Sequence, residues 1–193
     1  MQAKKLSDLI KVYDDVIDVE RCEGIIKMFD SHPDYHERIE RETKPDFTQM
    51  NITSFTRDSD EHSSRDRDNH QFLVSVFTNY AALYCSDLMI TDEHPPQYAL
   101  EELRVKKYNV GTDQFSEHVD VGNHNSGRRY LAFFLYLNDI ETGGETRFPY
   151  LNLSVQPKSG RLIVFPPMWM FPHAGLPTTE TPKYIVGSYC HYL

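Results

Sequence analysis

The feature that most constrains the fold is residues 130–137, Tyr-Leu-Ala-Phe-Phe-Leu-Tyr-Leu, which are apolar at every position. A strand whose two faces are both apolar is covered on both sides, so this segment is predicted to be a central, buried strand. From residue 99 onward, other short apolar segments follow, separated by turns rich in glycine and proline. Short strands separated by such turns indicate two packed β-sheets, in a sandwich or a barrel.

The residues before position 99 carry mainly helical patterns. We predict four elements there, in chain order: a short strand and turn at 9–17, a helix at 19–30 capped by Asp18, a strand at 47–56 and a longer helix at 69–90. The mixed-charge run 57–68 is predicted to be a solvated loop before the second helix. The alternative for this part of the chain is a lid over the functional site, within residues 45–69.

These elements predict one α+β domain over residues 1–193 that is mainly β. Residues 1–98 would form a helical support region, and residues 99–193 would form the β-rich part. Within the latter, Leu103 and Val105 share one face of a strand while Tyr108 has the opposite parity. The N-terminal helices are therefore expected on the outer face of one sheet, with Tyr108 pointing into the interior.

Composition excludes several classes of protein. The net charge of -9 over 193 residues speaks against a general nucleic-acid-binding surface. No segment approaches the ~20 apolar residues of a membrane span, and the first residues hold no apolar run of signal-peptide length. The three cysteines are odd in number and widely spaced, which favours free thiols in a reducing compartment. We expect a cytoplasmic protein with neither a membrane nor a nucleic-acid partner.

The candidate site begins at His118-Val119-Asp120. Residues i and i+2 of a strand point to one face, so the imidazole and the carboxylate would converge. His173, much later in the chain, supplies a third ligand, and two histidines with one carboxylate form the facial set of non-haem Fe(II) oxygenases. A second His-x-Asp, at 32–34, is set aside because its central proline and its position after a helix indicate a turn.

Further motifs follow in order. Gly143-Gly144-Glu145-Thr146-Arg147-Phe148 is a glycine turn leading into a strand, and residues 157–165 read Pro-Lys-Ser-Gly-Arg-Leu-Ile-Val-Phe. With these motifs and the ligand set, residues 100–193 resemble the Fe(II)/2-oxoglutarate-dependent dioxygenase superfamily, and within it the prolyl 4-hydroxylase-like group. The resemblance implies a double-stranded β-helix core of the jelly-roll or cupin kind.

The resemblance also implies a role for each matched residue. The implied roles are metal binding and catalysis for His118, Asp120 and His173, 2-oxoglutarate binding for Lys183, Tyr108 and Tyr136, and substrate binding for Arg129 and His191. A cation at Lys183 agrees with charge logic, because a dianionic co-substrate in a low-dielectric barrel needs one. The cofactor set implied is Fe(II), 2-oxoglutarate and dioxygen, with ascorbate as a reductant.

The implied activity is that of a 2-oxoglutarate-dependent dioxygenase of the procollagen-proline 4-dioxygenase type. It would hydroxylate a prolyl residue in a peptide or protein and convert 2-oxoglutarate to succinate and CO2. The alternatives are hydroxylation of a free amino acid or another small molecule, demethylation of nucleic acid, which the acidic charge disfavours, and a non-catalytic metal-binding β-barrel module.

Several residues near the site have a structural reading beside the functional one. Trp169 is expected in the core rather than as a substrate platform, and His124 is expected to be solvated. The family pattern has Trp-x-His where this chain has Tyr189-Cys190-His191. Parity places Arg129 and Tyr136 on opposite faces of their strand unless a bulge lies between them.

Overall fold

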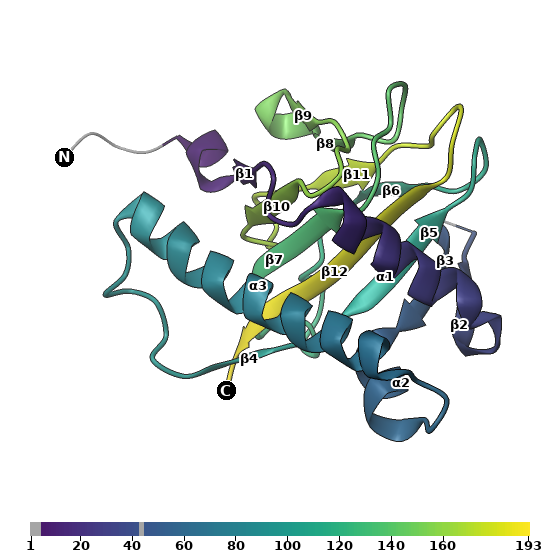
Figure 1. The fold of residues 1–193 in the computed structure, drawn as a ribbon. Helices are drawn as coiled ribbons and strands as arrows, with labels where there is room; N and C mark the ends of the chain where they lie inside the picture. The colour runs from purple at the N-terminus through teal and green to yellow at the C-terminus, as the bar shows by residue number, and fades with distance from the viewer. Residues whose placement is uncertain (1–4, 43–44) are drawn as a thin grey trace.

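Two antiparallel sheets face each other, and helices cover the outer side of the larger one (Figure 1). The computed structural model describes residues 5–42 and 45–193. Strands of the larger sheet, in spatial order, are β1 (Lys11–Tyr13), β10 (Leu162–Phe165), β7 (Arg129–Tyr136), β12 (Lys183–Tyr192), β5 (Arg104–Tyr108), β3 (Asp46–Asn51) and β2 (His36–Glu40), with β4 (Tyr98–Leu100) beside β12. The smaller sheet consists of β6 (Phe115–His118), β11 (His173–Gly175), β8 (Thr146–Phe148) and β9 (Leu153–Val155).

The helices of the described chain are α1 (Val19–Ser31), α2 (Ile52–Asp58) and α3 (Ser64–Leu88), together with the short 3-10 turns Leu6–Leu9, Pro33–Tyr35 and Pro149–Leu151. Figure 1 shows α1 and α3 lying across the face of the larger sheet that is turned away from the smaller one. No helix of the described residues is long and apolar enough to cross a membrane. The prediction of a mainly β fold with helices on the outer face of one sheet is confirmed.

Strand alternation divides the interior into two cores. On β7, Leu131, Phe133 and Leu135 pack toward the helices, whereas Phe134 and Tyr136 pack between the two sheets. Because β7 lies between β10 and β12 and is covered on both faces, the central buried strand predicted at 130–137 is present. The same alternation on β5 and β12 decides which side chains can reach the space between the sheets.

Capping residues decide where the N-terminal helices begin. Asp18 caps α1 as predicted, its carboxylate accepting a 2.7 Å hydrogen bond from the backbone N–H of Arg21. The second long helix starts earlier than predicted, because Ser63 and Asp66 form a reciprocal capping box at its N-terminus. Part of the charged run 57–68 is therefore the first turn of α3.

The strand predicted at 47–56 was wrong in its second half. Asn51 ends β3 and caps α2, its side chain accepting a hydrogen bond from Ser54 N–H at 3.1 Å. Ile52 and Phe55 are then buried against the helices. The expected helical support region at 1–98 also contains β1 to β3 and the first residue of β4, all of which join the larger sheet.

The alternative of a lid within residues 45–69 stays a prediction, although much of this stretch lies in regular secondary structure. β3 is hydrogen-bonded between β2 and β5, and Met50 on it is fully buried. α2 packs against α3 on the outer face of the sheet. β3 and α2 are therefore integrated into the larger sheet and its helical layer.

Two smaller expectations have different outcomes. Trp169 is 74% exposed, so its placement in the core was wrong; Phe171, two residues later in the same turn, is fully buried instead. The three cysteines, Cys22, Cys85 and Cys190, are free, as expected, and the structure shows that all three are buried. The cytoplasmic location stays a prediction.

Candidate metal centre

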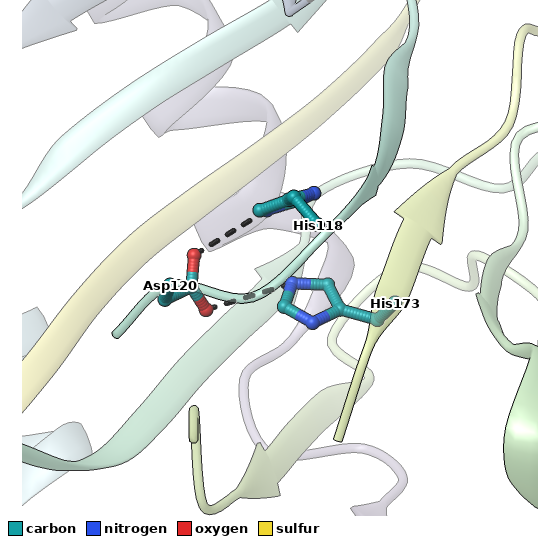
Figure 2. A group of neighbouring side chains, drawn as sticks. All are labelled: His118, Asp120 and His173. Carbon is teal, nitrogen blue, oxygen red and sulfur yellow. Dashed lines mark ion pairs between the residues drawn. The ribbon is translucent and has the colours of Figure 1, made fainter. Parts of the chain in front are cut away.

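The candidate ligands meet because β6 and β11 are neighbours in the smaller sheet. His118, the last residue of β6, pairs directly with His173, the first residue of β11. Asp120 follows two residues after His118, and its carboxylate faces both imidazoles (Figure 2). Asp120 Oδ1 is 3.4 Å from His118 Nε2, and Asp120 Oδ2 is 3.5 Å from His173 Nε2.

Backbone hydrogen bonds orient both imidazoles. His118 Nδ1 lies 2.8 Å from the carbonyl oxygen of Ser116, and His173 Nδ1 lies 3.1 Å from that of Phe171. Because a carbonyl oxygen can only accept, each Nδ1 carries the proton and each Nε2 presents a lone pair. In metal sites, a histidine that binds the metal through one ring nitrogen commonly donates a hydrogen bond from the other, and this bond fixes the orientation of the ring.

The three inward-facing atoms have no hydrogen-bond partner among the described residues. They are His118 Nε2, Asp120 Oδ2 and His173 Nε2, all of them buried. Buried polar atoms without partners are costly, so three of them converging on one point require a ligand. All ligand atoms of this group lie within 4.8 Å of one another, as a shared metal ion would require.

Electrostatics places His173 and Asp120 in the protonation states that bind metals. Burial lowers the pKa of His173 to about 4, so its imidazole is neutral at neutral pH. Burial alone would raise the pKa of Asp120, but its interactions with His173, His118 and the Tyr189 hydroxyl hold that pKa at about 2. A neutral imidazole beside an ionised carboxylate is the donor chemistry that Fe(II) accepts from two histidines and one carboxylate.

A cavity adjoins the metal ligands between the two sheets. Lys183, Tyr108 and Tyr136 line it, so the structure brings the predicted co-substrate residues to the predicted metal ligands. Lys183 is 2% exposed, and its ammonium donates a 2.8 Å hydrogen bond to the carbonyl oxygen of Gly144 and lies 4.6 Å from the ring centre of Tyr108. Burial lowers the pKa of Lys183 to about 7.

The two tyrosines differ in their contacts. The hydroxyl of Tyr136 donates to Thr146 Oγ1 at 2.6 Å. The hydroxyl of Tyr108 has no hydrogen bond within the described residues, although its ring is buried in the inner core. Tyr108 therefore offers a free hydroxyl to a molecule in the cavity.

Arg129 and His191, the predicted substrate residues, meet at Glu101. Arg129 binds the Glu101 carboxylate through two hydrogen bonds, of 2.7 and 2.8 Å, and His191 Nδ1 lies 3.5 Å from the same carboxylate. The strand register shifts between the Cys190 and His191 pairs, so that β7 carries an extra residue, Tyr130. This bulge brings Arg129 to the inner face, which strict parity would not allow.

Two residues of the site were missed by the sequence interpretation. Tyr189 donates a 2.9 Å hydrogen bond to Asp120 Oδ1, and the guanidinium of Arg129 stacks on its ring at 4.0 Å. Lys106 lines the cavity beside Asp120. Parity with Tyr108 was the signal available for Lys106, because residues two apart on a strand share a face.

Substitution of Tyr189 by phenylalanine is expected to weaken Fe(II) binding about tenfold, because hydrogen bonds to metal ligands typically contribute 10- to 100-fold to metal affinity. The ring would stay in place under Arg129, so the fold should not change. Anaerobic competition with a chelator measures the affinity. Tyr130→Phe is the control, since its hydroxyl contacts His94 away from the cavity; equal Fe(II) affinity in Tyr189→Phe and the wild type would remove Tyr189 from this role.

Comparison with known proteins agrees with this site. Residues 103–191 match the 2OG-Fe(II) oxygenase superfamily, a segment that contains every predicted metal-binding, co-substrate-binding and substrate-binding residue. The chain is 38% identical over 82 residues to a putative prolyl 4-hydroxylase of Acanthamoeba polyphaga mimivirus, covering 38% of this chain and 32% of that protein. It is 30% identical over 111 residues to prolyl 4-hydroxylase subunit alpha-1 of Gallus gallus, covering 47% of this chain and 20% of the relative.

A solved structure extends the likeness to almost the whole fold. The viral collagen prolyl hydroxylase of Paramecium Bursaria Chlorella virus-1, in its 2OG complex, has a TM-score of 0.66 and 20% identity, covering 96% of this chain and 97% of the other. The chain spans about a third or less of the length of the two curated relatives. The resemblance to 2OG-Fe(II) oxygenases of the prolyl 4-hydroxylase kind is thereby confirmed.

Proposed function

We propose that this chain is an Fe(II)- and 2-oxoglutarate-dependent dioxygenase that hydroxylates a prolyl residue in a peptide or protein. One observation carries the proposal: three orphaned, buried ligand atoms converge at the wall of a cavity that also contains the buried ammonium of Lys183. A metal site that is only structural has no need of a second, buried cation. The similarity to prolyl 4-hydroxylases supports the choice of substrate.

In this proposal, His118, Asp120 and His173 would hold the iron, as the two histidines and one carboxylate that non-haem Fe(II) oxygenases use. Bound Fe(II), 2-oxoglutarate and dioxygen supply the oxidation, in which 2-oxoglutarate becomes succinate and CO2 while the substrate gains a hydroxyl group. Lys183 neutralises the distal carboxylate of 2-oxoglutarate, and Tyr108 donates its free hydroxyl to the co-substrate.

Aromatic rings keep water from the centre. Phe134, Phe148 and Phe165 surround the imidazole of His173 with ring centres 4.9 to 5.7 Å away. In such surroundings the charges of Asp120 and Lys183 act more strongly than in water. On the open side, Arg129 and His191 would contact the peptide through the group that they form with Glu101.

The proposal extends to the architecture. We place the facing sheets in the double-stranded β-helix class and treat residues 1–193 as one oxygenase domain, on the strength of the shared fold of the viral hydroxylase. Free, buried cysteines support a reducing compartment, in which Fe(II) stays reduced.

An anaerobic titration of the metal-free protein with Fe(II) and 2-oxoglutarate tests the proposal. We expect a weak visible charge-transfer band when both are present, because a co-substrate that chelates iron through two oxygens produces one. Proline-containing peptides should then raise succinate release, and matched alanine peptides should not. Iron binding without the band would instead support a non-catalytic metal-binding module.

A further inference from the structure

A second ammonium group lies in the cavity beside the metal ligands. On β5, Lys106 shares the inner face with Tyr108, whereas Val105 packs toward the helices. The Lys106 side chain reaches the adjacent strand β12, where its Nζ lies 3.9 Å from the position that a Cβ atom on Gly187 would take. The ammonium also lies 5.0 Å from the ring centre of Phe47.

Lys106 differs from Arg129, Arg104 and Lys107 in having no anionic partner among the described residues. Arg129 binds Glu101, and Arg104 binds Glu102 at 3.0 Å. The neighbouring Lys107 points to the outer side, 3.6 Å from Asp30. No hydrogen bond or ion pair joins Lys106 Nζ to any residue that the structure describes.

The position of Lys106 is also distinct from that of Lys183. Lys106 lines both the inner cavity and a more open hollow beside it, which Arg104, Arg129 and Tyr189 also line. Lys183 lines only the inner cavity. Lys106 thus stands where the inner cavity meets the side from which a substrate can enter.

Charge balance favours an additional anion at this place. Among the described residues, Asp120 is the only carboxylate that lines the inner cavity, so it contributes one negative charge there. Lys106 and Lys183 contribute two positive charges. With doubly charged Fe(II) and dianionic 2-oxoglutarate both bound, one positive charge would remain uncompensated. An unpaired charge away from water is costly, so a further carboxylate would be stabilised there.

We propose that Lys106 binds a carboxylate group next to the metal ligands, on the side of the cavity away from Lys183. This inference rests on the proposed function and narrows its substrate class. Charge balance points to a carboxylate of the primary substrate, carried by an acidic residue beside the target proline. The other source of the same chemistry is the metal-binding carboxylate of 2-oxoglutarate.

Burial lowers the pKa of Lys106 to about 8, and Asp120 partly offsets this effect. The side chain is therefore mostly protonated at neutral pH, as carboxylate binding requires.

The test compares Lys106→Met with Lys107→Met, the adjacent lysine on the opposite face of the strand. Calorimetry measures 2-oxoglutarate binding to the Mn(II)-loaded proteins, and a second series measures binding of proline peptides that carry glutamate or glutamine beside the proline. We expect wild type and Lys107→Met to bind the glutamate peptide about tenfold more tightly than the glutamine peptide, and Lys106→Met to lose this preference.

The outcomes show whether the carboxylate comes from the substrate or from 2-oxoglutarate. They also distinguish failure of the Lys106 proposal from failure of the proposed function. A tenfold loss of 2-oxoglutarate affinity in Lys106→Met alone would identify the co-substrate as the source of the carboxylate. If Lys106→Met and Lys107→Met bind 2-oxoglutarate and both peptides with the same affinities, Lys106 does not bind a carboxylate. Failure of the wild-type protein to bind 2-oxoglutarate at all would instead contradict the proposed function.

Discussion

Substitution of His118 by alanine is expected to lower Fe(II) affinity by more than about a hundredfold and to abolish turnover. Removal of a group that only supports a metal ligand already lowers metal affinity 10- to 100-fold. His118 is itself one of the three converging ligands, so its loss should have a larger effect. Chelator competition and the iron content of the purified protein measure the affinity. Succinate release with and without peptide measures turnover.

Thermal unfolding supplies a readout that does not depend on activity. Metal that binds only the folded state stabilises it by about 2.7 kcal/mol at a hundredfold excess over Kd. Wild type should therefore unfold at a higher temperature when Mn(II) is added, whereas His118→Ala should show little change. The metal-free variant should fold normally, because in the wild type His118 Nε2 is a buried atom without a partner.

His124→Ala is the matched control for this experiment. His124 is exposed and follows His118 closely in the chain, in the loop after Asp120, and it is not a member of the ligand group. It should keep wild-type iron content, thermal response and turnover. Wild-type iron content in His118→Ala would show that the metal centre has been placed wrongly.

The metal centre could be predicted from sequence because its geometry is local. The spacing of His118 and Asp120 places both on one side of a strand end, whatever the rest of the chain does. The motifs around His173 then supplied the third ligand. The central strand at 130–137 was predictable for a similar reason, since two apolar faces need two covering layers.

Features that depend on partners distant in the chain could not be predicted. Arg129 reaches the inner face through a bulge, and the bulge is visible only in the register between β7 and β12. Trp169 and Phe171 are both large, apolar residues of one turn, and their sequence alone does not tell which of them faces the interior. The β-branched residues after Asn51 favoured a strand, but the cap at Asn51 and the burial of Phe55 stabilise a helix.

Substitution of Lys183 by methionine is the second change for which we expect a large effect. Affinity for 2-oxoglutarate should fall about 10- to 100-fold, because a hydrogen bond to a charged group contributes about 1.5 to 3 kcal/mol. Fe(II) affinity should remain near that of the wild type, because Lys183 is not one of the metal ligands. Calorimetric titration of the Mn(II)-loaded proteins with 2-oxoglutarate measures the loss.

The fold should tolerate this change. The Lys183 side chain is almost fully buried, and burial disfavours its charged form strongly enough to lower the pKa to about 7. Methionine has a similar length and no charge to desolvate, so metal-free Lys183→Met should be at least as resistant to urea as the wild type. Lys158→Met, on the surface beside Asp15, controls for the loss of a lysine elsewhere.

The pKa of Lys183 also gives 2-oxoglutarate binding a pH dependence. The ammonium form is the one that pairs with a carboxylate, and in the free protein it is lost as pH rises through about 7. Affinity should therefore be nearly constant below pH 7 and fall by up to about tenfold per pH unit above it, until the pKa of the bound state is reached. Lys183→Arg should show a weaker fall, because a guanidinium stays protonated over this range.

Neighbouring groups decide how this pH experiment is interpreted. Glu145 partly offsets the effect of burial on Lys183, and the Tyr108 hydroxyl, whose pKa burial raises, stays protonated throughout. Lys106 titrates in an overlapping range, with a pKa of about 8, but it is identical in wild type and Lys183→Arg. The difference between these two proteins therefore isolates Lys183, and identical pH profiles would show that another cation holds the co-substrate.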